Sequence, residues 1–73
     1  MEVYMDINSD VYRYEIGSDF IRLQFTAGAQ YLYTYASAGQ SNIEQMKILA
    51  QQGSGLDDFI WLTVVELHES RER

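Results

Sequence analysis

The chain has 73 residues, of which 47% are hydrophobic and 14% aromatic, so it is predicted to form one globular domain rather than a disordered segment. Eleven acidic residues against five basic ones give a net charge of −6, which disfavours a nucleic-acid partner because such binding depends on neutralising phosphates. The absence of cysteine excludes disulfides and thiolate metal sites, and one histidine is too few for a zinc site.

The first half of the chain is predicted to form an antiparallel meander of strands. Three runs of residues have the apolar content or the alternation of apolar and polar residues that is typical of strands. They are Val11–Ile16, Phe20–Phe25 and residues 29–35. Residues 1–7 alternate more weakly, so they are either an additional strand or a loosely held lead-in. We therefore expect three or four strands, each joined to the next by a hairpin.

Turn chemistry predicts how these strands pair. Gly17-Ser18 suits a two-residue hairpin turn, and residues 26–28 suit a three-residue loop that ends in glycine. The pairs predicted to lie opposite each other are Tyr14 with Ile21, Tyr12 with Leu23, Phe25 with Ala29, Leu23 with Tyr31 and Ile21 with Tyr33. Both turns then gather one apolar face, made of Tyr12, Tyr14, Ile21, Leu23, Phe25, Tyr31 and Tyr33. On the solvated face, Arg13 is predicted to lie opposite Arg22, with Glu15 on the diagonal.

The second half of the chain is predicted to be mainly helical. A helix over residues 42–52 has an apolar stripe that should cover the tyrosine-rich face, with Ser41 and Glu44 as a capping box and Gly53 as its stop. Residues 56–69 are predicted to form a second helix, with Ser54 as a candidate cap. The β-branched residues at 62–65 leave a strand as the alternative, while the acidic start of the segment and the basic finish at Arg71 and Arg73 favour the helix through its dipole.

The predicted fold is thus a single α+β domain over residues 1–73. A three- to four-stranded antiparallel meander packs against one capped helix, and a C-terminal helix follows. We expect its core within residues 8–62 and treat residues 63–73 as a C-terminal extension. The start of the chain does not have the pattern of a signal peptide, and its longest nearly unbroken apolar run, residues 59–65, is too short to cross a bilayer. We expect a cytoplasmic protein with no membrane partner.

The sequence does not indicate catalysis. His68 stands beside two glutamates but has no second histidine and no nucleophile to serve. The glycines around Ser54 lack the lysine of a phosphate loop, and Asp57-Asp58 lack the other oxygen ligands of a calcium site. We therefore expect no enzyme activity, no cofactor and no bound metal.

Two groups of residues are candidate binding surfaces. The first is a partner or homodimer interface on the C-terminal apolar segment, formed by Phe59, Trp61, Leu62 and Val65, where exposed apolar area would mark a contact. The second is an RNA contact formed by Arg13, Arg22, Tyr31, Tyr33 and Tyr35. Stacked bases suit such an aromatic strand. However, Tyr31 and Tyr33 are predicted to belong to the core beneath the helix, whereas Tyr35 suits either role.

Short motifs also give a resemblance to a known family. They are Ser9-Asp10-Val11, Phe25-Thr26-Ala27-Gly28, Tyr31-Leu32-Tyr33, the helix that follows, and Gly53-Ser54-Gly55 leading to Phe59-Ile60. In this order they resemble the KTSC domain, over roughly residues 9–60. The resemblance implies a small module, found at the C-terminus of some lysyl-tRNA synthetases and as stand-alone bacterial proteins, with a proposed but not established role in RNA binding. It implies Tyr31 and Tyr33 as the central motif and nothing catalytic.

The sequence thus predicts a small non-enzymatic protein-interaction module that binds a protein partner or forms a homodimer. An RNA-binding module that uses the aromatic strand and the local arginines is the alternative. The acidic charge opposes this alternative, and the resemblance does not account for the apolar segment from Trp61 onwards.

Overall fold

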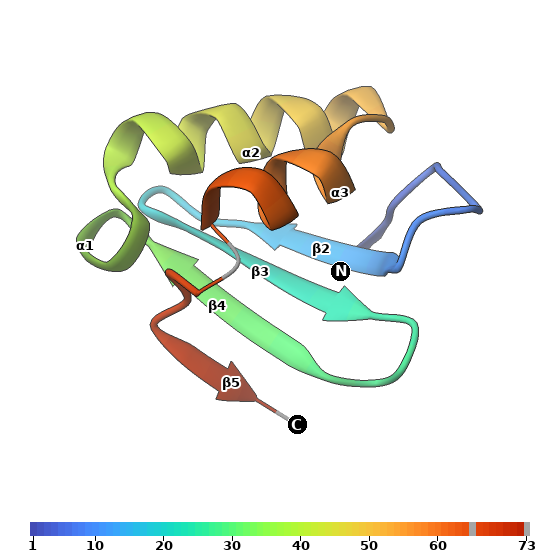
Figure 1. Cartoon of the computed structure of the whole chain (residues 1–73), viewed down its shortest axis with the longest axis horizontal. Helices are drawn as coiled ribbons and strands as arrows, with labels where there is room; N and C mark the ends of the chain where they lie inside the picture. Colours follow the sequence, from blue (N-terminus) through green and yellow to red (C-terminus); the bar gives the residue numbers. More distant parts are fainter. Residues whose placement is uncertain (65, 73) are drawn as a thin grey trace.

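The computed structural model describes residues 1–64 and 66–72, and the side chains of residues 1–64 and 66–70. Five strands form one antiparallel sheet in the order of the chain, and they are β1 Glu2–Val3, β2 Val11–Ile16, β3 Phe20–Phe25, β4 Gln30–Thr34 and β5 Ser70–Glu72. The helices are α1 Tyr35–Ala38, α2 Gln40–Gln52 and α3 Leu56–Phe59, which continues into the π-helical turn η1 Ile60–Val64. Both α2 and α3 lie on the same side of the sheet (Figure 1). The predicted α+β meander with a covering helix and a C-terminal helix is confirmed.

The predicted register between β3 and β4 is confirmed. Leu23 pairs with Tyr31 and Ile21 pairs with Tyr33, and the amide of Phe25 donates to the carbonyl of Ala29 across 2.8 Å. Gly28 closes this hairpin with φ +99°, a left-handed conformation that side chains other than glycine rarely adopt. The turn predicted for this loop therefore correctly predicted which side chains of β3 and β4 face the core.

The predicted register between β2 and β3 is wrong. Tyr14 pairs with Leu23 rather than Ile21, and Glu15 rather than Arg13 lies opposite Arg22, with which it forms an ion pair. The turn lies one residue later than predicted, because the amide of Gly17 donates to the carbonyl of Phe20 across 3.0 Å and leaves Ser18 and Asp19 between them. Gly17 is outside the two central residues of the turn and does not have a positive φ, and a Cβ there would overlap the ring of Phe20 unless that ring moved.

A β-bulge in β2 also changes which residues face the core. The register shifts between Val11 and Arg13, so Val11 is buried with 2% of its surface exposed. Tyr12, which was predicted to lie on the apolar face, is instead 42% exposed. The bulge breaks the alternation of side chains, as an extra residue in one strand must.

The helix α2 packs Ile43, Met46 and Ala50 onto the sheet, as the apolar stripe predicted. The predicted capping box at Ser41 is wrong, since α2 already begins at Gln40. The capping box occurs earlier, where Thr34 accepts a hydrogen bond from the Ser37 amide and the Ser37 hydroxyl accepts one from the Thr34 amide, both at 3.0 Å. It starts the short helix α1, while α2 ends as predicted at Gly53, whose φ is +82°.

The C-terminal helix ends earlier than predicted, at Val64, and Ser54 does not cap it because Gly55 occupies that position. The predicted strand at residues 62–65 is not formed at residues 62–64, and Val65 lies outside the described residues. Arg71 belongs to β5, opposite Tyr31, so the dipole argument that placed it at a helix end is wrong. The chain turns back because the outer edge of β4 offers unpaired backbone groups to a returning strand.

The N-terminal segment supplies the other edge of the sheet and a latch to α3. Glu2 and Val3 pair with β2, which bears out an additional strand in this region. The buried Tyr4 hydroxyl accepts the Leu56 amide across 3.1 Å, at the start of α3. The carboxylate of Asp57 accepts hydrogen bonds from the Ser9 hydroxyl and, across 2.9 Å, from the Asp10 amide. These bonds hold the segment before β2 against the helix.

The buried core lies between the sheet and the helices. Its members are Tyr4, Val11, Tyr14, Ile21, Leu23, Tyr33, Ala38, Ile43, Met46, Ala50, Leu56, Ile60 and Val64. The last helix contributes three of them at intervals of four residues, from Leu56 to Val64, so one side of it is core. Within the described part of the chain, the helices are too short or too polar to span a membrane.

Candidate functional site

The predicted interface residues take different positions on the last helix. Phe59 is half-buried and packs against the core, whereas Trp61 is 58% exposed and Leu62 is 86% exposed. Val65 is outside the described residues. The two exposed side chains belong to η1, between the buried Ile60 and Val64. Such π-helical turns are rare and occur often at functional sites.

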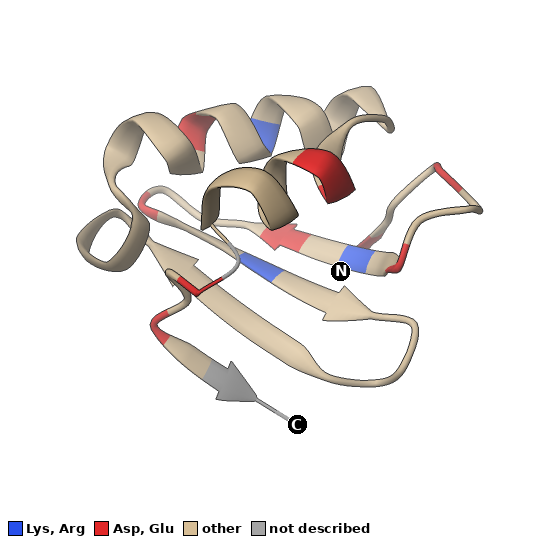
Figure 2. Ribbon diagram, viewed as in Figure 1, with Lys and Arg blue, Asp and Glu red and all other residues tan. Residues whose placement is uncertain are grey.

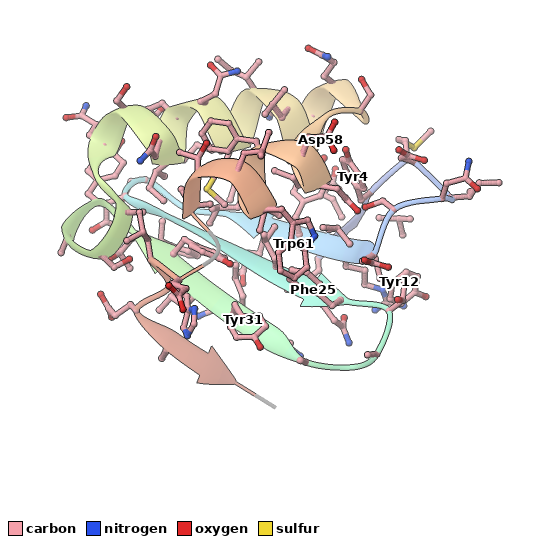
Figure 3. The ribbon with its side chains drawn as sticks, in the orientation of Figure 1. Tyr4, Tyr12, Phe25, Tyr31, Asp58 and Trp61 are labelled. Carbon is pink, nitrogen blue, oxygen red and sulfur yellow. The ribbon has the colours of Figure 1, made fainter. Side chains whose placement is uncertain are left out.

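Trp61 also borders a small cavity, which we call the aromatic pocket. Its volume is about 80 Å³, and it is lined by Phe25, Tyr31, Tyr33, Ile60, Trp61 and His68. Trp61 extends from the last helix toward Phe25 at the end of β3, and Tyr31 lies below them on β4 (Figure 3). Tyr33 and Ile60 are almost fully buried and form the floor, while Trp61 lies at the exposed rim.

The rings of Phe25, Tyr31, Tyr33 and His68 in the aromatic pocket contact one another edge to face or at a tilt. The centroids of Phe25 and Tyr31 are 5.6 Å apart with an interplanar angle of 81°, and those of Tyr31 and His68 are 4.7 Å apart. His68 also meets Tyr33 at 6.1 Å and 83°. Such pairs stabilise by roughly 0.5–1.5 kcal/mol beyond the area they bury. The rings therefore support one another in a fixed arrangement.

The polar groups in the aromatic pocket are mostly shielded from solvent. Burial raises the pKa of the Tyr33 hydroxyl to about 12, because the phenolate loses its hydration. The Nδ1 atom of His68 is buried and has no hydrogen-bond partner within the part of the chain that the structure describes. The site is thus an aromatic recess whose lining includes tyrosine hydroxyls and the imidazole of His68 but no carboxylate.

Sequence reasoning assigned only part of this pocket. It named Trp61, Tyr31 and Tyr33, but in different candidate groups. It rejected a catalytic or metal-binding role for His68 and placed Phe25 only on the apolar face of the sheet. His68 reaches the rings because the chain returns beside β4, where the Glu69 amide donates to the Leu32 carbonyl across 2.6 Å. This pairing is a contact between distant residues, and the local sequence carries no signal for it.

Tyr35 lies apart from the pocket in a polar cluster. Its hydroxyl donates to the Glu44 carboxylate at 2.5 Å, and the Lys47 ammonium bonds the same carboxylate at 2.7 Å. The hydrogen bond to Glu44 raises the pKa of Tyr35, and the bond from Lys47 is the largest cause that lowers the pKa of Glu44. Tyr35 therefore links α1 to α2 and has a structural partner for its hydroxyl.

The arginines of the predicted RNA contact lie on the sheet face that α2 and α3 do not cover. The Arg13 guanidinium lies 4.7 Å from the ring centroid of Tyr12, and that of Arg22 lies 5.3 Å from the ring centroid of Phe20. Tyr31 and Tyr33 belong to the opposite, helix-covered face. The structure does not bring the predicted arginines and tyrosines together.

The described basic side chains are also spread over the molecule. Arg13 is on β2, Arg22 on β3 and Lys47 on α2, with acidic residues between them (Figure 2). Among the described residues, His, Asp and Glu do not form a cluster of three that could hold a metal ion.

Comparison of the chain with protein-family models, with curated proteins and with solved structures gave no match. The resemblance to the KTSC domain therefore stays a prediction that rests on its short motifs.

Proposed function

We propose that the chain is a small, non-enzymatic, cytoplasmic protein-interaction module, and that it binds a second copy of itself or another protein through the Trp61 surface. We define the Trp61 surface as Trp61, Leu62 and the rim of the aromatic pocket. The observation that carries the proposal is the exposure of Trp61, at 58%, and Leu62, at 86%, on one helical turn beside that pocket. Tryptophan is enriched among the residues that dominate binding energy in interfaces.

The size of the chain supports self-association in particular. A domain of 73 residues buries only about 60% of the surface of its unfolded chain, so its stability is marginal. Small domains commonly add disulfides, metals or oligomerisation, and this chain contains no cysteine. A stable interface covers roughly 800 Å² per partner, about a fifth of the 4413 Å² surface here. The contact would thus extend beyond the two exposed side chains to their neighbours.

The test is the molecular mass in solution as a function of concentration, measured by light scattering. We expect the mass to rise from monomer to dimer, and Trp61→Ala to weaken the dimer at least about 30-fold, since truncating a central tryptophan costs about 2 kcal/mol or more. Ile48→Ala is the matched control, because Ile48 is also exposed, at 55%, but lies on α2.

Two outcomes would contradict self-association through this surface. One is a mass that stays monomeric at the highest soluble concentration. The other is a dimer that survives Trp61→Ala or is weakened equally by Ile48→Ala. Both variants should keep the fold, because neither side chain belongs to the buried core.

RNA binding is the second candidate, and one observation favours it. Two arginine–aromatic pairs, Arg13 with Tyr12 and Arg22 with Phe20, lie on the sheet face opposite the buried side chains of β2 and β3. The ion pair between Arg22 and Glu15 and the net charge of −6 oppose it. An amide chemical-shift titration with mixed tRNA, at low and at physiological salt, tests this candidate. Shifts that cluster on these four residues and vanish with salt would favour RNA over a protein partner.

A further inference from the structure

We propose that the aromatic pocket binds a trimethylammonium group, as found in choline or in the side chain of trimethyl-lysine. The inference deepens the proposed function, because Trp61 belongs both to the pocket and to the surface that would meet a partner. Four aromatic rings and His68 enclose the site, from β3, β4, the last helix and the segment before β5 (Figure 3). Groups of aromatic side chains that surround a small space are a known means of holding quaternary ammonium ions.

The volume of the pocket limits the size of the group that it can hold. At about 80 Å³ it is far smaller than the roughly 300–1,000 Å³ of sites that enclose a whole drug-sized ligand. A water molecule occupies about 30 Å³ in the liquid, so the space suits a compact group of a few heavy atoms. The occupant is therefore the end of a larger molecule or a small ion, with the rest of the molecule lying outside.

The lining favours a cation that donates no hydrogen bonds. An unmodified lysine ammonium has three donors, and burying them without acceptors costs free energy. The lining offers too few acceptors for three such donors and no carboxylate, since its polar atoms are those of two tyrosines, Trp61 and His68. A trimethylammonium group carries its charge without any N–H, so it needs no acceptor. It gains the attraction of the ring faces, worth about 0.5–2 kcal/mol per contact.

The negative charge of the chain also favours a cationic ligand. Its net charge of −6 attracts cations to the surface and repels anions, and the residues that line the pocket include no carboxylate and no lysine or arginine. The rings thus supply local attraction while the net negative charge of the chain supplies the field. A neutral group of the same shape would gain from burial but not from either of these effects.

The experiment compares choline with 3,3-dimethylbutan-1-ol, which has the same shape but no charge. Binding is followed by amide chemical shifts and by the fluorescence of Trp61, the single tryptophan of the chain. We expect choline to bind at least about fivefold more tightly than the alcohol, because about 1 kcal/mol of cation–ring attraction corresponds to that ratio. The shifts should cluster on the residues that line the pocket.

Two variants locate the site. Trp61→Ala should abolish saturable shifts from choline, whereas Ile48→Ala should leave them unchanged, because Ile48 is about as exposed as Trp61 but lies on α2 and does not line the pocket. Equal binding of the alcohol, no binding of choline at 100-fold excess over a millimolar protein sample, or equal loss in both variants would overturn the proposal.

Further measurements distinguish a protein source of the trimethylammonium group from a small-molecule source, and they test this inference separately from self-association. A peptide that contains trimethyl-lysine, compared with its unmodified form, tests a protein source, and tighter binding of choline than of that peptide would indicate a free small molecule. Light scattering on the same samples reports the mass. If choline binds and the protein stays monomeric, this inference is supported and self-association is contradicted. If the protein forms a Trp61-dependent dimer that does not bind choline, self-association is supported and this inference is contradicted.

Discussion

Replacing Tyr33 with alanine is expected to lower the free energy of unfolding by about 3–5 kcal/mol, the usual cost of removing a buried aromatic side chain. Tyr33 is 2% exposed and lies opposite the fully buried Ile21 in the sheet. It belongs to the same buried cluster as Ile43 and Met46 of α2. Removing the ring would enlarge the aromatic pocket, whose floor Tyr33 forms, and would take contacts away from the buried residues around it.

Such a loss would be a large part of the total stability. Domains of 73 residues unfold with about 4–11 kcal/mol, from the usual range per residue. Urea denaturation followed by circular dichroism measures the change, with the midpoint as the primary readout. We expect Tyr33→Ala to be partly unfolded at room temperature if the wild type lies near the lower limit of that range.

Two control variants test whether packing is the cause. Tyr33→Phe keeps the ring and is expected to cost less than about 1.5 kcal/mol, as volume-conserving changes do. Tyr31→Ala removes a ring that is only half-buried, so its cost should be clearly smaller than that of Tyr33→Ala. An unchanged midpoint for Tyr33→Ala would show that the ring is not part of the core, and the stacking role considered from the sequence would regain support.

The two hairpins show which parts of the fold local sequence can predict. In the β3–β4 loop, Gly28 is the residue that takes a positive φ, and the turn type then fixed the register. In the β2–β3 loop, Gly17 is present for a different reason, the close approach of the Phe20 ring. A glycine in the sequence does not reveal which of these needs it meets, so the second register could not be derived from it.

The C-terminal segment was harder to predict because its structure depends on distant residues. The sequence from Leu56 has helical spacing, and the helix does form, but it ends at Val64 where the chain turns toward the open edge of β4. Strand formation by three residues such as those of β5 follows from the edge that receives them rather than from their own propensity. The aromatic pocket depends on the same return, because it places His68 against Tyr31.

Replacing Asp57 with alanine is expected to cost about 1.5–3 kcal/mol, the range for hydrogen bonds to a charged group. Its carboxylate accepts hydrogen bonds from the Ser9 hydroxyl and the Asp10 amide, which come from a segment 47 or 48 residues earlier in the chain. The Ser9 hydroxyl in turn accepts the amide of the buried Val11 across 2.9 Å. Loss of the carboxylate therefore loosens the approach to β2 as well as α3.

Asp58→Ala is the matched control for this change. Asp58 lies in the same first turn of α3, so both carboxylates have the favourable interaction with the helix dipole, worth about 0.3–1 kcal/mol. The difference between the two variants isolates the bonds to Ser9 and Asp10. Equal losses of stability in urea denaturation would mean that the dipole accounts for the effect and that the hydrogen bonds from Ser9 and Asp10 contribute nothing.

A double-mutant cycle with Ser9→Ala and Asp57→Ala measures the contribution of the Ser9–Asp57 hydrogen bond. Ser9 is 8% exposed, and its removal also leaves the Val11 amide without its partner, so the single change is expected to cost about 1–3 kcal/mol. If the Ser9–Asp57 bond stabilises the fold, the double variant should lose less than the two single losses combined, with a coupling of at least about 0.5 kcal/mol. Additive losses would mean that each side chain acts through its backbone contacts alone, and the N-terminal segment would then be held to α3 chiefly by Tyr4.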